Sequence, residues 1–150
     1  KMIKINSPLS GELSGHVMYK DDFYGFDDAM YVGLRFLRII SQKNESLNEI
    51  ITLFPKTFST PEIRIDVDES RKFKIIEEIK IRQNKKGINI ETIDGLRVNL
   101  RDGWWGIRAS NTQNALTIRV EAKDQKILNE MLLNIEKELK VSEIDFKFSS

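Results

Sequence analysis

Apolar and polar residues alternate along the second half of the chain in the way that is typical of half-buried strands. Residues 63–67 show the alternation first, and it returns over 96–100 and 116–120. Two shorter runs, 88–90 and 104–108, carry apolar residues between the clearer segments. The pattern therefore predicts five strands between Glu62 and the last helical segment.

Two helical segments accompany these strands. We expect Asp68 to begin the first, and its apolar face to carry Phe73, Ile76 and Ile79. Asp124 is placed to cap the second, in which every fourth residue is apolar: Ile127, Met131, Ile135 and Leu139. Asp-Gly pairs at 94–95 and 102–103 favour tight hairpin turns. The order predicts an α+β fold, an antiparallel sheet with two helices on one face.

The first third of the chain is organised differently. Residues 2–5 favour a short strand, 7–16 are rich in turn formers and predict a loop, and 17–19 favour a short buried strand. A helix begins near Asp27 or Asp28 and is apolar nearly all round, as is usual for a helix buried on two sides. We interpret this part as an incomplete α/β segment whose packing partners lie elsewhere.

Two prolines within seven residues divide the chain. Residues 48–54 continue in a helical pattern, and Pro55 to Pro61 interrupts it. We expect one domain segment over 1–54, a hinge or linker over 55–61, and a second domain over 62–150. Because Lys1 precedes Met2 and a strand-like segment follows at once, the chain resembles a piece of something longer.

Composition excludes several classes of function. The 24 Lys and Arg nearly balance the 23 Asp and Glu, so no overall field recruits nucleic acid or an anionic membrane surface. With no cysteine and only His16, disulfides, thiolate zinc sites and multi-histidine metal clusters are excluded. Since no apolar run approaches the roughly 20 residues that cross a bilayer, and no secretory signal is visible, we expect a soluble cytoplasmic protein.

The first candidate site is the glycine-containing loop over 10–16. Its glycines permit close backbone approach, and Glu12, Ser14 and His16 can project toward one ligand. A carboxylate beside a hydroxyl suits the vicinal hydroxyls of a sugar. The residues alone leave a second interpretation open, a flexible loop with a capping serine and a surface histidine.

The second candidate site follows the strand over 104–108. Ile107 should face the core, so Arg108 faces the other way and leads into Ser110, Asn111 and Thr112. The planar fork of arginine matches phosphate oxygens, and the hydroxyls and loop amides can complete a cradle. By residue type alone, a polar turn beside a surface ion-pairing arginine fits about as well.

Other polar and aromatic groups fit structural roles better. Trp104 and Trp105 could stack on a sugar, but strand packing explains them more simply. The pairs Asp21-Asp22 and Asp66 with Asp68 suit turns and caps better than metal binding. We therefore predict no metal site on this chain.

Five motifs, in their order and spacing, resemble the bacterial phosphomannomutase/phosphoglucomutase branch of the α-D-phosphohexomutase superfamily. They are Gly-Glu-Leu-Ser-Gly-His at 11–16, Tyr-Gly-Phe-Asp-Asp at 24–28, Ser-Thr-Pro-Glu-Ile at 59–63, Asp-Gly-Leu-Arg-Val at 94–98 and Arg-Ala-Ser-Asn-Thr at 108–112. The resemblance covers almost the whole chain. It implies the end of the third of four domains, followed by the complete fourth.

The resemblance also implies roles for the two loops. Glu12 and Ser14 would bind hexose hydroxyls, and His16 would line the cleft as a candidate for proton transfer. Arg108, Ser110, Asn111 and Thr112 would hold the non-transferring phosphate. Gln113-Asn114 departs from the threonine-proline pair common at this point, which predicts a looser loop exit.

The implied parent enzyme interconverts hexose 1-phosphates and 6-phosphates of mannose or glucose, with magnesium as cofactor. Its phosphoserine loop and its magnesium loop would belong to N-terminal domains, which are the implied partners of this chain. The piece should therefore bind phosphosugars but be inactive alone. The alternative is a stand-alone α+β phosphate-binding or regulatory module, which would need residues 1–48 to be self-sufficient.

Overall fold

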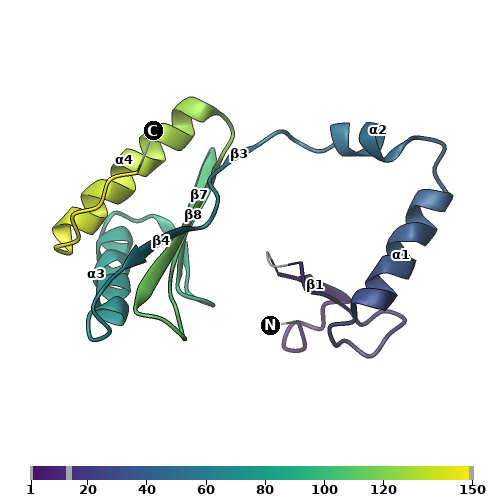
Figure 1. Cartoon of the computed structure of the whole chain (residues 1–150), viewed down its shortest axis with the longest axis horizontal. Helices are drawn as coiled ribbons and strands as arrows, with labels where there is room; N and C mark the ends of the chain where they lie inside the picture. The colour runs from purple at the N-terminus through teal and green to yellow at the C-terminus, as the bar shows by residue number, and fades with distance from the viewer. Residues whose placement is uncertain (1, 13–14, 149–150) are drawn as a thin grey trace. The chain divides into compact units, whose positions relative to one another are not determined.

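The computed structural model describes residues 2–12 and 15–148. The chain divides into two compact units, with the boundary between Pro55 and Lys56 (Figure 1). The first unit holds two short strands and two helices, and the second holds a larger sheet and two longer helices. Each unit is described by itself below.

A six-stranded antiparallel sheet forms the centre of the second unit. Strands β5, β6, β7 and β8 lie side by side, and β3 and β4 both pair with the remaining edge of β8. The strands are β3 (Phe58–Ser59), β4 (Ile63–Asp66), β5 (Asn89–Glu91), β6 (Leu96–Leu100), β7 (Gly103–Ala109) and β8 (Ala115–Ala122). The five predicted strands are present, and β3 is an addition that the turn-rich sequence around it concealed.

Helices α3 (Lys72–Lys85) and α4 (Gln125–Val141) cover one face of this sheet (Figure 1). Asp124 caps α4 by accepting a hydrogen bond from the amide of Ile127 at 2.8 Å. The core between the layers contains the inward residues of β4, β6, β7 and β8 together with one stripe of each helix. The predicted α+β architecture is confirmed, and the opposite face of the sheet is left for polar side chains.

The prediction of the buried face of α3 was wrong at one residue. Phe73 is 61% exposed, whereas Ile75 and Ile79 are buried and Ile76 packs at the edge of the core. The buried stripe continues through Lys72 and Gln83, which are polar. A pattern that counts only apolar residues therefore misjudges the direction in which this helix faces.

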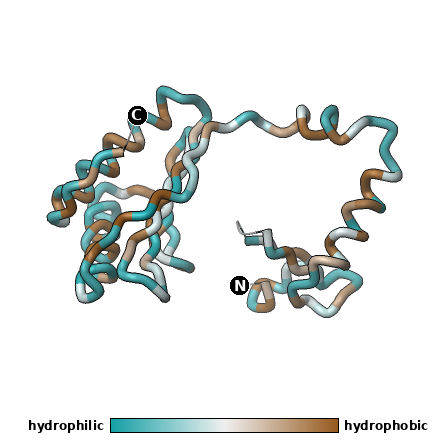
Figure 2. The backbone as a smooth tube through the Cα atoms, in the orientation of Figure 1, coloured by the Kyte–Doolittle hydropathy of each residue, from teal (hydrophilic) through white to brown (hydrophobic). Residues whose placement is uncertain are grey.

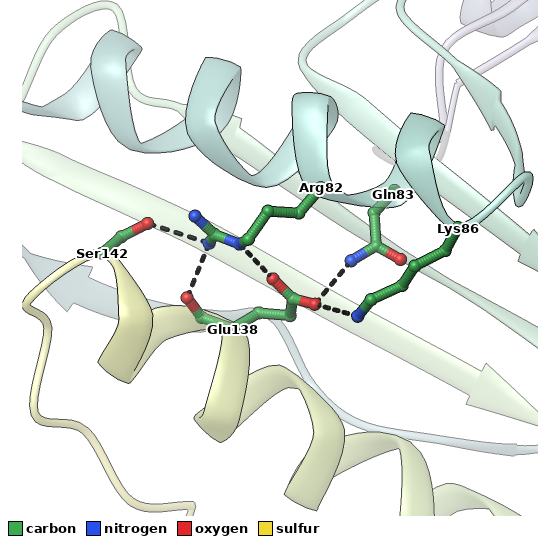
Figure 3. A network of polar contacts seen from close by, with 5 residues as sticks. All are labelled: Arg82, Gln83, Lys86, Glu138 and Ser142. Carbon is green, nitrogen blue, oxygen red and sulfur yellow. Dashed lines mark hydrogen bonds and ion pairs between the residues drawn. The ribbon is translucent and has the colours of Figure 1, made fainter.

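A polar cluster joins α3 to α4 (Figure 3). The carboxylate of Glu138 accepts hydrogen bonds from Arg82 at 2.6 Å, Lys86 at 2.6 Å and Gln83 at 2.8 Å. Arg82 also donates to the hydroxyl of Ser142 at 2.9 Å, just beyond the end of α4. The cluster fixes the two helices against each other at the edge of the core.

The first unit begins with a hairpin of β1 (Leu9–Gly11) and β2 (Val17–Tyr19). The prediction of a strand over residues 2–5 was wrong, because these residues form turns; the strand that pairs with β2 is β1, inside the segment that was predicted to be a loop. Helices α1 (Ala29–Ser41) and α2 (Leu47–Thr52) follow, and Asp28 caps α1 by accepting from the amide of Tyr31.

Helix α1 exposes most of its apolar side chains. None of its residues is buried, and its tube in Figure 2 is brown over much of its length. The exposed apolar residues are Met30, Leu34, Phe36, Leu37 and Ile39. Although α1 is rich in such residues, no helix in the described part of the chain is long and apolar enough to cross a membrane.

Candidate phosphosugar-binding site

The loop between β7 and β8 carries the predicted phosphate-binding residues. Ile107 is buried at the end of β7, and Arg108 extends from the opposite face of the sheet, as the strand alternation predicted. The register places Arg108 opposite Thr117 of β8, and Thr117 opposite Arg64 of β4. Three polar side chains therefore form one row across neighbouring strands, on the face that the helices leave open.

A pocket of about 290 Å³ is lined by all three residues of this row. All four predicted phosphate-binding residues line it. The complete lining is Glu62, Arg64, Arg108, Ala109, Ser110, Asn111, Thr112, Gln113 and Thr117. The structure thus brings the predicted residues together, and it adds groups from β4 and β8.

Short hydrogen bonds shape the backbone of this loop. Ser110 donates its amide to Ala115 at 2.9 Å, and the hydroxyl of Ser110 accepts from the amide of Gln113 at 3.2 Å. Within residues 2–12 and 15–148, no acceptor is bonded to the amides of Asn111 and Thr112. Two backbone donors of the loop are therefore available to an anion, in addition to the guanidinium of Arg108.

Lys72 supports the loop from below. Its side chain is only 3% exposed, and Nζ donates to the carbonyl of Ser110 at 2.8 Å and to that of Gln113 at 3.4 Å. Glu69 lies 2.9 Å from the same ammonium. Because one cation binds the carbonyls at both ends of the loop, Lys72 fixes the loop's shape.

Arg108 is paired with two carboxylates. Its Nη1 lies 3.2 Å from Asp94, and its Nη2 lies 4.0 Å from Glu62. The Arg108 side chain is 50% exposed and both acids are more exposed still, so these ion pairs contribute little stability. Arg108 is thus an ion-pairing surface residue whose partners are weak enough to be exchanged for another anion.

The glycine loop over 10–16 begins within β1 and ends directly before β2. Glu12 and His16 close its base, because the Glu12 amide donates to the His16 carbonyl at 2.8 Å. Gly15 has a φ of +91°, a conformation that favours glycine. Ser14, the third predicted sugar-binding residue, lies outside the described residues.

His16 is held by an aspartate. Its Nδ1 lies 2.5 Å from Oδ2 of Asp27, and both side chains are well exposed. Asp27 is itself held beside β2 through a bridge to Met18. In the tautomer that donates a hydrogen bond from Nδ1 to Asp27, the lone pair of the His16 ring lies on Nε2, the nitrogen that points away from this contact.

The remaining candidates have structural roles. Trp105 is buried in the core, and Trp104 lies on the other face with the guanidinium of Arg97 4.1 Å from its ring. Asp21 accepts a hydrogen bond from Arg35 at 2.6 Å, which lowers the pKa of Asp21. Among the described residues, no group of three or more histidine, aspartate or glutamate side chains could hold a metal ion.

Family models match both units of the chain. The model described as phosphoglucomutase/phosphomannomutase, C-terminal domain, matches residues 62–138, and the one described as phosphoglucomutase/phosphomannomutase, alpha/beta/alpha domain III, matches residues 1–58. The chain belongs to the phosphoglucomutase/phosphomannomutase family. The resemblance that the five motifs indicated is thereby confirmed.

Named relatives in this family are longer than the chain. A phosphomannomutase/phosphoglucomutase of Pseudomonas putida is 39% identical over 148 residues, which cover 94% of this chain and 32% of the relative. A phosphoglucomutase of Neisseria gonorrhoeae is 41% identical over 126 residues, covering 83% of this chain and 27% of the relative. A solved family structure from Burkholderia thailandensis is 33% identical with a TM-score of 0.82, covering 95% of this chain and 30% of that one. The chain thus spans about a third of the length of these family members.

Sequence reasoning missed several residues of the site. Arg64 and Lys72 lie far from the loop in sequence. The pairing of β4 with β8 brings Arg64 to the loop, and the side of α3 that faces the sheet brings Lys72 to it. Asp27 was visible as part of an Asp-Asp pair, but nothing in the sequence distinguished it from its capping neighbour Asp28. For Lys72, a lysine at an apolar helix position is the signal that could have been used.

We expect Lys72→Met to weaken both the loop and its binding of anions. The variant removes hydrogen bonds to two loop carbonyls, so the free energy of unfolding should fall by about 1 to 2 kcal/mol. Inorganic phosphate should bind severalfold more weakly, because the loop amides lose their fixed directions. Lys74→Met removes an exposed lysine from the same helix and is the matched control. A Lys72→Met chain with normal phosphate affinity would contradict the positioning role.

Proposed function

We propose that this chain is the C-terminal part of a phosphomannomutase/phosphoglucomutase that interconverts hexose 1-phosphates and 6-phosphates. In this role, Arg108, Ser110, Asn111 and Thr112 bind the phosphate that is not transferred. The pocket that these residues share carries the proposal, because it combines a guanidinium, two hydroxyls and unbonded loop amides around one space.

The glycine loop would bind the hexose at its ring hydroxyls. Glu12 can accept from hydroxyls and Ser14 can both donate and accept, which suits vicinal sugar oxygens. His16, oriented by Asp27, would accept or return a hydroxyl proton as the phosphoryl group moves. Mannose and glucose phosphates are the proposed substrates, in agreement with the names of the relatives.

Phosphoryl transfer depends mainly on positioning and on stabilisation of charge. A chain that holds the ring and one phosphate supplies positioning, while the phosphoserine that would donate the phosphoryl group belongs to the proposed N-terminal part. The described residues include no group of side chains that fits a magnesium site, and in the proposed enzyme that site belongs to the N-terminal part. We therefore expect this chain alone to bind phosphosugars without turning them over. The hinge over residues 55–61 stays a prediction.

Inorganic phosphate provides the direct test of the phosphate pocket. In the 150-residue chain, phosphate and mannose 1-phosphate should shift the amide signals of residues 108–112. Arg108→Gln should weaken binding at least about tenfold, because a charge-assisted hydrogen bond contributes about 1.5 to 3 kcal/mol. Arg101→Gln changes the same charge outside the pocket and should bind normally. Unshifted amides in a folded chain at high phosphate concentration would contradict the proposal.

The alternative, a stand-alone binding or regulatory module, predicts the same phosphate binding. The coding sequence upstream of Lys1 separates the two functions. A serine phosphorylation loop and an aspartate-rich loop encoded there would support the mutase. A start codon directly before Lys1 would support the module. The exposed apolar side of α1 favours the mutase, since it suits a helix that packs against further structure.

A further inference from the structure

We propose that Arg64 is a second phosphate-binding guanidinium, which faces Arg108 across the pocket and makes the site selective for a doubly charged phosphoryl group. The inference rests on the proposed function of the pocket. It adds a residue from β4, outside the Arg-Ala-Ser-Asn-Thr loop that the family resemblance assigned to phosphate.

The sheet register brings the two arginines together. Arg64 pairs with Thr117, and Thr117 pairs with Arg108, so one strand spacing separates each neighbour in the row. Strands lie about 4.8 Å apart, which places the two arginine Cα atoms roughly 10 Å from each other. Both side chains line the pocket, with Thr117 between them. A phosphate above Thr117 would therefore lie between two guanidinium groups.

The strand alternation gives Arg64 this direction. Ile65 is buried in the core on the side of the helices, so Arg64 projects from the open face, as Arg108 does beside buried Ile107. The direction is set by the backbone and does not depend on a particular rotamer.

The present partners of Arg64 are exchangeable. Its Nε lies 3.2 Å from Asp66, whose side chain is strongly exposed, and its Nη1 donates to the side-chain oxygen of Gln113. An exposed ion pair of this kind contributes little. Gln113 belongs to the phosphate loop, so the contact already directs the guanidinium toward the place that an anion would occupy.

Two guanidinium groups suit the charge of the ligand. A phosphate monoester near neutral pH carries between one and two negative charges, and each nearby cation favours the doubly charged form. Glu62 in the same lining opposes anion binding, and a single arginine would be partly neutralised by it. Among the charged residues that line the pocket, Arg64 and Arg108 together outnumber Glu62 and leave one net positive charge.

Phosphate titrations of four single variants of the 150-residue chain test the inference. Arg64→Gln should weaken the binding of inorganic phosphate about tenfold. Arg64→Lys keeps the positive charge but lacks the planar, two-pronged guanidinium, and its phosphate affinity should fall about threefold. Gln113→Ala should lose less phosphate affinity than Arg64→Gln, because it removes only the side-chain contact that directs Arg64. Arg101→Gln should match the wild type.

A phosphorus NMR titration separates direct contact from support of the loop. If Arg64 contacts the ligand, the second pKa of bound phosphate should be lower in the wild type than in Arg64→Gln, because a nearby cation stabilises the dianion. An unchanged phosphate pKa would overturn the inference. A loss in Gln113→Ala as large as that in Arg64→Gln would overturn it too, since Arg64 would then act only through the loop.

The outcomes also distinguish this inference from the proposed function. If Arg108→Gln abolishes phosphate binding and Arg64→Gln leaves it intact, the pocket binds phosphate but the assignment of Arg64 as a second phosphate-binding residue is wrong. If the folded wild type does not bind phosphate at all, both proposals are overturned.

Discussion

Gly95→Ala should destabilise the second unit by about 4 kcal/mol or more, a loss at the upper end for a single substitution. Gly95 ends the turn before β6 with a φ of +75°, and a Cβ there would lie 2.4 Å from the carbonyl oxygen of Ile107 and 2.9 Å from Cα of Arg108. Both contacts are to backbone, so no side-chain rotation can relieve them. The strain would push on the end of β7, from which Arg108 projects, and phosphate binding should weaken as well.

Gly87→Ala is the matched control for this prediction. Gly87 follows α3 with a φ of +69°, but a Cβ there would meet nothing within 4 Å. Gly87→Ala should lower the free energy of unfolding by only about 1 to 2 kcal/mol, which is the cost of a left-handed conformation for a residue with a Cβ. Urea unfolding followed by tryptophan fluorescence suits both variants, since Trp104 and Trp105 lie in β7. Equal losses would show that the close approach to Arg108 has no energetic effect.

The fold of the second unit was largely predictable from sequence, because its strands and α4 follow simple periods. Alternation over 116–120 and the four-residue repeat of α4 each identify a buried face directly. Phe73 was misjudged because the buried stripe of α3 includes Lys72, a residue that any hydropathy pattern assigns to solvent. Residues 2–5 were misjudged because a short apolar segment forms a strand only when another strand pairs with it, and β2 pairs with β1.

The candidate site was predictable as a loop and unpredictable as a pocket. Arg108 to Thr112 are consecutive in sequence, so residue types and strand alternation located them. Arg64 and Lys72 reach the same loop from β4 and α3, and their contribution depends on a strand register and a helix rotation. Neither follows from local sequence, since a shift of one residue in register would place Arg64 on the core face.

Glu138→Gln should lower the free energy of unfolding by about 2 to 3 kcal/mol at pH 7. Removing one partner from a buried ion pair costs about 3 to 5 kcal/mol, and partial exposure of Arg82 and Lys86 reduces this. The glutamine would also turn an amide donor toward the cationic groups that now donate to the carboxylate. Glu130→Gln changes an exposed glutamate of the same helix and should stay within about 0.5 kcal/mol.

The same carboxylate makes stability depend on pH in the acid range. Burial raises the pKa of Glu138, but hydrogen bonds from Lys86 and Arg82 outweigh it and hold that pKa below the ordinary value. A carboxyl whose pKa falls on folding stabilises the native state above its unfolded pKa of about 4.3, and this contribution is lost as pH falls through the folded pKa. The pKa values of Asp68 and Glu136 are lowered as well, through hydrogen bonds from Ser70 and from Phe148 and Lys147, so the losses add. Urea midpoints measured from pH 7 to pH 3 should therefore fall less steeply for Glu138→Gln than for the wild type, and parallel curves would mean that Glu138 does not carry this dependence.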